Sequence, residues 1–267
     1  DLHSFPTRRS SDLVVVAREI RYIEKMGVII HRNTHVGVEI TVDSLFDQGF
    51  DAVFIGTGMG KPRSLEIPIY RNGQCLSEGE NAIHCEDLVG VRFAIHFLRR
   101  VELIAEGFMT PDETHVHKGA HVWVIGGGNT AMDASRTALR IGASQVDVIF
   151  NEGIDTMSAL RAEYDDAVKE GVRFNWWASI KEIHVDDNMD IKEIVLETAE
   201  PGKEPVLQTL PANNIIMAIG ATPHTKIVRT TSGLENDERR FLITRDLPYG
   251  MTTRKGVFAG GDVANRQ

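Results

Sequence analysis

The stretch HVWVIGGGNTAMDASRTALRIGASQVDVIF, residues 121–150, decides the fold. It begins with an apolar run at 121–125 and continues through three consecutive glycines. Small and apolar residues then recur at helical spacing as far as Gly142, and a second apolar run follows at 146–150. This order predicts a strand, a glycine-rich turn, a helix over 130–141 and a second strand. Such a βαβ unit belongs to a parallel sheet.

Within this stretch, Gly126, Gly128 and Ala131 fit the dinucleotide-binding pattern G-x-G-x-x-A. The first glycine allows a tight turn, the second lets the backbone approach a pyrophosphate, and the alanine lets the helix pack close to the strand. The helix N-terminus would face the anion. Because a strand and a helix flank the motif, we interpret it as a dinucleotide site and not as a turn that binds nothing. The predicted site comprises Gly126, Gly127, Gly128, Asn129, Thr130 and Ala131.

The second strand is followed by Asn151 and Glu152. An acidic residue near this position usually accepts hydrogen bonds from the adenosine ribose. A carboxylate would also repel the additional phosphate of NADPH, for which an arginine is better suited. Glu152 therefore favours NADH over NADPH. The alternative is that Glu152 is a solvated loop residue.

The rest of the chain continues the alternation of strands and helices. Patterns predict helices over 17–26, 88–104 and 158–169, and strands over 28–30, 52–55, 180–184, 191–196, 215–219 and 256–259. The sequence thus predicts the α/β class with a parallel, doubly wound sheet.

Composition excludes several function classes. The 267 residues carry 29 Lys and Arg against 38 Asp and Glu, a net charge of −9, which disfavours nucleic acid as a partner. No run approaches the roughly 18 apolar residues of a membrane span, so we expect a soluble protein without a membrane partner. Cys75 and Cys85 match neither a redox pair nor a zinc site. Because the two cysteines form no recognisable pair, a reducing cytoplasm is the expected setting. His115, His117 and His121 have no nearby carboxylate or thiolate set, and we predict no metal.

Three further motifs follow in a recognisable order around GGGNTAMD (126–133). They are TGMGKP (57–62), AIGATP (218–223) and GVFAGGD (256–262). Together the four motifs resemble the flavoproteins with two dinucleotide-binding domains in the pyridine nucleotide-disulfide oxidoreductase superfamily. Within that superfamily the chain is most similar to the small (beta) subunit of glutamate synthase and its relatives.

The resemblance implies a Rossmann-like NAD(P) domain over 109–240, inserted in a partial FAD domain formed by 14–108 and 241–267. Asp262 would bond the ribityl chain of FAD, and Gly261 and Gly58 would let the backbone approach that cofactor. Gly220 marks the exit of the inserted domain and completes the predicted cofactor-binding set.

The implied reaction passes a hydride from NAD(P)H to FAD, and electrons then pass to an iron–sulfur or large catalytic subunit. The cofactors carry this chemistry, so we nominate no catalytic residue.

The sequence departs from the family at both ends. The FAD fingerprint G-x-G-x-x-G that the family carries near its amino terminus is absent, so we expect an incomplete FAD site. Residues 1–13, DLHSFPTRRSSDL, resemble translated sequencing adapter, and we expect a disordered, non-native leader. A fragment of this kind is expected to bind nucleotide with negligible turnover. The alternative function is a nucleotide-binding module or gene fragment without redox turnover.

Overall fold

The computed structural model describes residues 13–110, 116, 118–245 and 250–264, and it divides into two compact units. The central unit runs from Ser64 to Gly220. The terminal unit combines the chain before it, from residue 12 to 63, with the chain after it, from residue 221. The predicted leader at 1–13 lies outside the described residues except for Leu13, which begins helix α1.

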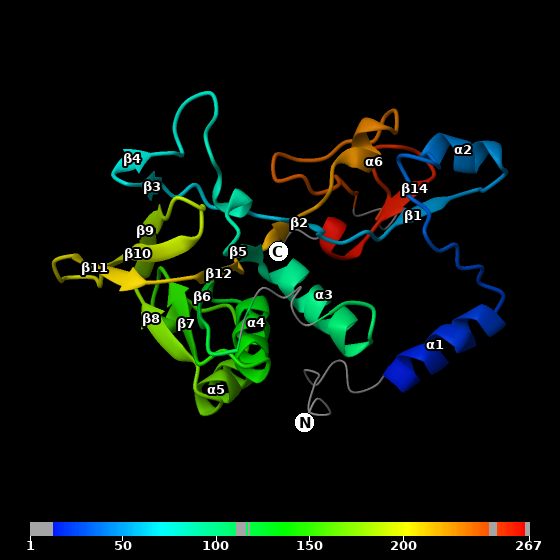
Figure 1. The fold of residues 1–267 in the computed structure, drawn as a ribbon. Coiled ribbons are helices and arrows are strands. Elements are labelled where there is room, and N and C mark those ends of the chain that lie inside the picture. The colour runs from blue at the N-terminus through cyan, green and yellow to red at the C-terminus, as the bar shows by residue number, and fades with distance from the viewer. Residues whose placement is uncertain (1–12, 111–115, 117, 246–249, 265–267) are drawn as a thin grey trace. The chain divides into compact units, whose positions relative to one another are not determined.

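The central unit contains a parallel sheet of five strands in the order β5-β12-β6-β7-β8 (Figure 1). Every neighbouring pair in it is parallel. The βαβ prediction for 121–150 is confirmed, with one helix joining β6 to β7 and another joining β7 to β8. The bounds are β5 Val91–Phe93, β6 His121–Ile125, α4 Asn129–Arg140, β7 Gln145–Phe150, α5 Arg161–Lys169, β8 Arg173–Trp176 and β12 Asn214–Met217.

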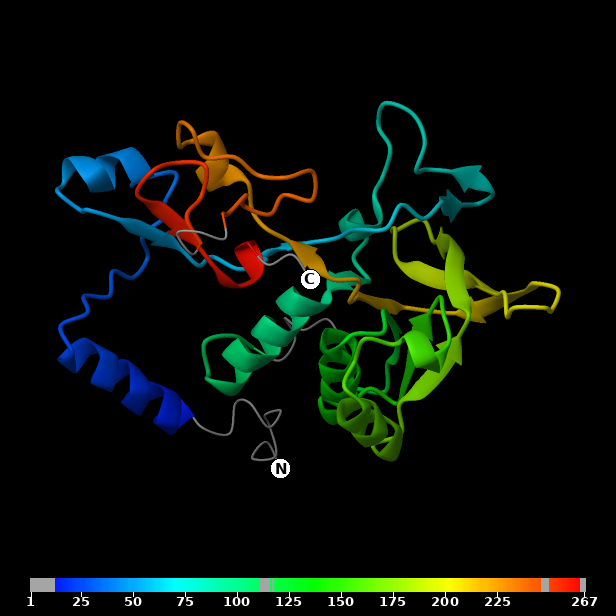
Figure 2. The same ribbon diagram turned by 180° about the vertical axis from the view of Figure 1, so that it is seen from behind.

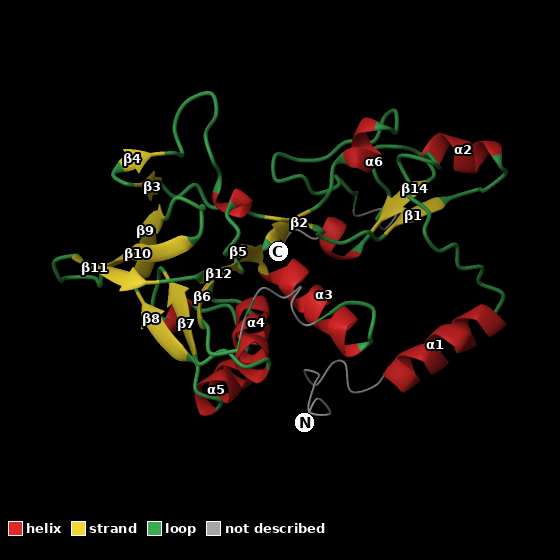
Figure 3. Ribbon diagram, viewed as in Figure 1, coloured by secondary structure: helices red, strands yellow, loops and turns green. Residues whose placement is uncertain are grey.

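The parallel sheet is covered differently on its two faces. Val122 and Val124 of β6 point into a core with α4, α5 and helix α3 (Ala94–Ala105). Their neighbours Trp123 and Ile125 point into a second core, shared with another sheet. That sheet has the order β11-β10-β9-β3-β4 (Figure 3). Its strands are β3 Ile69–Arg71, β4 Gln74–Cys75, β9 Ala178–Val185, β10 Ile191–Thr198 and β11 Val206–Pro211.

This layering corrects the prediction of a doubly wound sheet, because helices cover one face only. The second face is buried by β-strands, which satisfies the same need to cover a parallel sheet on both sides. The α/β class itself is confirmed.

Two local predictions are also corrected. The apolar run 28–30 forms no strand, because within the described chain no strand pairs with it. Its side chains are exposed. The predicted helix over 88–104 begins only at Ala94, because 91–93 form β5 and pair with β12.

In the terminal unit, strand β1 (Val53–Ile55) pairs in parallel with β14 (Val257–Ala259), and Figure 2 shows these strands from behind. A small core of Val42, Ile55, Leu242 and Val257 packs around them. The remaining α-helices and β-strands are α1 Leu13–Lys25, α2 Val42–Asp47, β2 Lys61–Pro62, β13 Ala221–Thr222 and α6 Lys226–Arg229, and a short 3-10 helix spans Gly261–Val263. In the part of the chain that the structure describes, no helix is long and apolar enough to span a bilayer.

The unit boundaries at 63/64 and 220/221 differ from the boundaries predicted at 108/109 and 240/241. The central unit includes 64–108 because β5 joins the parallel sheet and β3 pairs with β9. The assignment of the two units to NAD(P) and FAD stays a prediction.

Candidate functional site

Gly126 forms the sharp turn at the end of β6. Its φ is +136°, a backbone conformation that residues with a side chain rarely adopt. Its N–H donates a 2.9 Å hydrogen bond to the carbonyl of Ile149, the penultimate residue of β7. A Cβ at this position would lie 2.4 Å from the carbonyl oxygen of Ala218. The turn therefore requires glycine for structural reasons, whether or not a ligand binds.

The next two glycines have different surroundings. A Cβ on Gly127 would lie 2.6 Å from the Phe150 ring, so this position too is filled by the protein. At Gly128, the N-cap of α4, the nearest atom to a Cβ would be Ser158 Oγ at 3.5 Å, an ordinary contact. The protein itself leaves room above Gly128, which is where a ligand could approach the backbone.

The first residues of α4 complete the turn. The Asn129 carboxamide oxygen accepts a 2.8 Å hydrogen bond from the Leu160 N–H and ties the loop before α5 to the start of α4. Thr130 lines a pocket, and Ala131 is fully buried on the inner face of the helix. The first N–H groups of a helix have no acceptor within it, so this end of α4 offers donors to an anion.

The glycine turn opens into a pocket of about 600 Å³, which lies wholly within the central unit. Its size suits a small-molecule or cofactor site. The lining comes from the glycine turn, from the carboxyl ends of β7 and β12, from the start of β9 and from the segment 65–67. Most of it is apolar or small, including Ile125, Ile149, Ile180, Ala218 and Ile219.

Of the predicted site residues, Gly126, Gly127, Gly128, Thr130 and Gly220 all line this pocket. Gly220 has a φ of +88° and lies three residues after the end of β12, directly before β13. Glu152 is exposed and lies outside the pocket lining, while its neighbour Asn151 is part of that lining. The Glu152 carbonyl accepts a hydrogen bond from the Trp177 N–H at 3.1 Å.

Sequence reasoning missed Ser158, Ser179 and the segment 65–67, which also line the pocket. Ser158 could have been suspected, because it follows the second strand of the fingerprint unit closely. No local signal marks Ser179 or 65–67, since β9 and β3 reach the pocket only through the second sheet.

Gly58, Gly261 and Asp262, the residues predicted to bind FAD, lie in the terminal unit. Because β1 and β14 are parallel neighbours, their carboxyl ends bring the loops after Ile55 and Ala259 to the same edge. The Gly260 N–H donates to the Ile55 carbonyl at 3.2 Å.

Both predicted FAD-binding glycines have open surroundings. Gly58 and Gly261 have φ values of +64° and +69°, and a Cβ on either would contact nothing within 4 Å. The Asp262 side chain belongs to an exposed residue. Glycines with free space allow a ligand to approach the backbone, and an accessible carboxylate suits a part of the ligand that carries hydroxyl groups.

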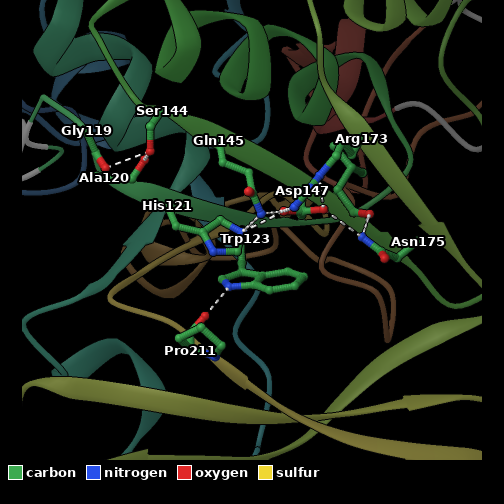
Figure 4. Close-up of polar contacts among 11 residues, drawn as sticks. Gly119, Ala120, His121, Trp123, Ser144, Gln145, Asp147, Arg173, Asn175 and Pro211 are labelled. Atoms are coloured by element: carbon green, nitrogen blue, oxygen red, sulfur yellow. Dashed lines mark hydrogen bonds and ion pairs between the residues drawn. The ribbon is translucent and has the colours of Figure 1, made fainter.

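A second polar constellation occupies the opposite, amino-terminal end of the parallel sheet (Figure 4). Asp147, only 4% exposed, accepts hydrogen bonds from Arg173 Nε at 3.0 Å and Nη2 at 2.6 Å. Gln145 Nε2 donates to it at 2.7 Å, and His121 Nε2 lies 2.6 Å from the same carboxylate. The carboxylate is thus satisfied by its neighbours, as a buried charge must be. His115 and His117 lie outside the described residues.

The sequence matches the family described as pyridine nucleotide-disulphide oxidoreductase over residues 12–267. It is 31% identical to the beta subunit of the NADP(+)-dependent formate dehydrogenase of Moorella thermoacetica, over 93% of this chain and 33% of the relative. It is also 31% identical to the NADPH glutamate synthase small chain of Escherichia coli K12, over 93% of this chain and 52% of the relative.

Identity to the beta subunit of the NADPH-Fe(3+) oxidoreductase of Geobacter sulfurreducens is 29%, over 93% of this chain and 38% of the relative. The chain therefore spans only about one third to one half of these relatives. Among solved structures, T. acidophilum thioredoxin reductase aligns with a TM-score of 0.55 and 20% identity over 81% of this chain and 58% of its own. This likeness supports the fold, that of a flavoprotein with two dinucleotide-binding domains.

Proposed function

The chain belongs to the pyridine nucleotide-disulphide oxidoreductase family, and we propose that its central unit binds a nicotinamide dinucleotide, NADH or NADPH. One observation carries the proposal. The glycine turn at 126–128 places the N-terminus of α4 at a pocket formed by the carboxyl ends of two further parallel strands. Ligands of open α/β sheets bind at this edge.

The pocket offers a different surface to each part of the ligand. The donors at the start of α4 suit the pyrophosphate, with Gly128 leaving it room. The adenosine half would extend over the end of β7, where Asn151 lines the pocket, and the nicotinamide half over the end of β12 at 218–220. The apolar floor excludes water from the nicotinamide.

For the whole protein, we propose the transfer of a hydride from NAD(P)H to FAD. The terminal unit would hold FAD through Gly58, Gly261 and Asp262, which share one edge of its sheet. A bound flavin accepts a hydride as two electrons and releases them singly. An iron–sulfur or large catalytic subunit is the proposed acceptor. Names of relatives as subunits support a partner of this kind. The proposed setting is the cytoplasm.

We further propose a preference for NADH. Among the described residues that line the pocket, none is lysine or arginine, so the additional phosphate of NADPH would find no cation there. Glu152 directly follows Asn151 and would add repulsion. The relatives compared above carry NADP(+) or NADPH in their names, so a preference for NADH would distinguish this chain from them.

Calorimetric titrations with NADH and with NADPH test both proposals. We expect NADH to bind more tightly, and Glu152→Gln to narrow the difference. Tighter binding of NADPH would overturn the NADH preference but keep the nucleotide site. If the chain unfolds cooperatively yet binds neither nucleotide, the proposed site is wrong.

The second candidate function is nucleotide binding without redox turnover, for which the pocket of the central unit would suffice by itself. Oxidation of NADH by ferricyanide, measured with and without added FAD, separates the two candidates. FAD-dependent oxidation by this chain favours the oxidoreductase. Nucleotide binding with no oxidation favours the binding module.

A further inference from the structure

Glu66 is the one ionisable side chain among the described residues that line the pocket. A carboxylate is an unexpected feature in a pocket for a ligand with a pyrophosphate, because like charges repel each other. It must therefore face a part of the ligand that is remote from the phosphates and that donates hydrogen bonds.

The backbone on both sides of Glu66 is fixed. Ile67 is 7% exposed and packs in the core between the two sheets of the central unit. The Ile67 carbonyl accepts a hydrogen bond from the Cys85 thiol at 3.7 Å, and burial raises the pKa of that thiol, which keeps its proton in place. Two residues later, Ile69 pairs with Ile183 of β9. Glu66 is thus an exposed carboxylate on an anchored segment.

Chain connectivity places Glu66 on one side of the glycine turn. The segment 64–67 follows β2, and the residues 218–220 precede β13, while β2 and β13 are antiparallel partners. Both segments therefore depart from neighbouring positions, and both line the pocket. Asn151 lies at the end of β7, and β6 separates β7 from β12. Glu66 therefore lies near the carboxyl end of β12, on the side of the pocket opposite the proposed position of the adenosine half.

We infer that Glu66 accepts a hydrogen bond from the NH2 group of the nicotinamide carboxamide and so determines how the ring is oriented. This inference rests on the proposed nucleotide site. The carboxamide NH2 group is the N–H donor at that end of the ligand, and an aligned carboxylate is a strong acceptor for it. The orientation of the ring decides which face can deliver a hydride.

The test compares ligands that differ only in this half. Calorimetry on the full chain measures ADP-ribose, which lacks the nicotinamide, NADH, and the reduced 3-acetylpyridine analogue, in which a methyl group replaces the amine. We expect Glu66→Ala to weaken NADH about tenfold and to leave ADP-ribose unchanged. Wild-type chain should prefer NADH to the analogue, and Glu66→Ala should abolish that preference.

Two variants serve as controls. Glu66→Gln keeps an acceptor oxygen without the charge, and we expect it to retain part of the preference for NADH. Glu80→Ala removes an exposed carboxylate outside the pocket lining and should change no affinity. The unfolding temperature of each variant shows whether its fold is intact.

The outcomes separate this inference from the proposed function. An equal loss of ADP-ribose and NADH in Glu66→Ala would place Glu66 on the adenosine half and overturn the inference. Unchanged NADH binding, or an unchanged preference for NADH over the analogue, would also overturn it. In these cases the nucleotide site stands. Failure of the folded wild-type chain to bind even ADP-ribose would instead reject the nucleotide site itself.

Discussion

The two ends of the parallel sheet in the central unit differ in how their polar groups are satisfied. At the amino-terminal end, the Asp147 carboxylate is surrounded by donors from three neighbouring strands. At the carboxyl end, the three glycines of the turn carry no side chains, so the donors at the start of α4 face a pocket. The same strands β6 and β7 contribute to both ends.

The amino-terminal end of the sheet is therefore expected to contribute to stability, and the carboxyl end to ligand binding. A buried charge with complete partners contributes to the fold and leaves nothing for a ligand. A helix N-terminus without internal acceptors costs little in water and gains most when an anion arrives. Substitutions at the two ends should therefore change different quantities.

The largest effect is expected for Gly126→Ala, which should lower both the free energy of unfolding and the affinity for NADH. The methyl group would clash with the Ala218 carbonyl, and φ would remain at +136°. Strain and overpacking together predict a loss of about 4 kcal/mol in the free energy of unfolding. Urea denaturation measures it, and loss of NADH binding should accompany it. A change below about 1 kcal/mol would show that the turn can relax.

The next effect is expected for Asp147→Asn, which keeps the shape of the side chain and removes its charge. Arg173 and His121 would lose their anion, at a cost of about 2 kcal/mol in unfolding free energy. This is less than the roughly 3–5 kcal/mol for a fully buried pair, because Arg173 is half-exposed. NADH affinity should stay unchanged in calorimetry. A parallel loss of affinity would mean that the two ends are coupled.

Gly128→Ala is expected to have the converse effect. The fold leaves space for the methyl group, so the unfolding free energy should change by only about 0.5 kcal/mol. The methyl group would obstruct the approach of the pyrophosphate and weaken NADH about tenfold, equivalent to about 1.4 kcal/mol. Unaltered affinity would show that this glycine does not face the ligand.

The smallest effect concerns Glu170, which joins α5 to α4 away from both ends. Burial raises the pKa of Glu170, but hydrogen bonds from Arg136 and Arg140 outweigh it, and the net pKa lies below its ordinary value. A lowered pKa in the folded state contributes stability above the ordinary pKa of about 4.3, which is lost as the pH falls through the folded-state value.

Glu170→Gln should therefore lower the free energy of unfolding at neutral pH by about 1 kcal/mol. This difference from the wild-type chain should shrink as the pH falls below about 4. Urea denaturation across this pH range measures it. A difference that is independent of pH would contradict the assignment to the ion pairs.

Local pattern was enough to predict the βαβ unit, because 121–125 form a continuous apolar run and the small apolar residues of α4 recur at helical spacing. It failed where a strand depends on distant partners. The strand β11 has exposed residues in most positions and forms by pairing with β10. The apolar run 28–30 was predicted as a strand on composition alone, and the described chain supplies it with no pairing partner.

The candidate site shows the same limit. The glycine turn could be predicted because each requirement lies within a few residues of the next. The position that lines the pocket after β7 is Asn151 and not Glu152, a shift of one residue that pattern cannot resolve. Glu66 lies at the pocket because Ile69, three residues later, pairs with Ile183, which is more than 100 residues away in sequence, and no local signal indicates this pairing.

We propose that the carboxyl end of the parallel sheet binds a nicotinamide dinucleotide. Calorimetric titration of the wild-type chain with NADH, repeated on Gly128→Ala and Asp147→Asn, tests it most directly. We expect one bound NADH per wild-type chain, weaker binding to Gly128→Ala and unchanged binding to Asp147→Asn. Absence of binding to a cooperatively folded wild-type chain, or weakening by Asp147→Asn alone, would contradict it.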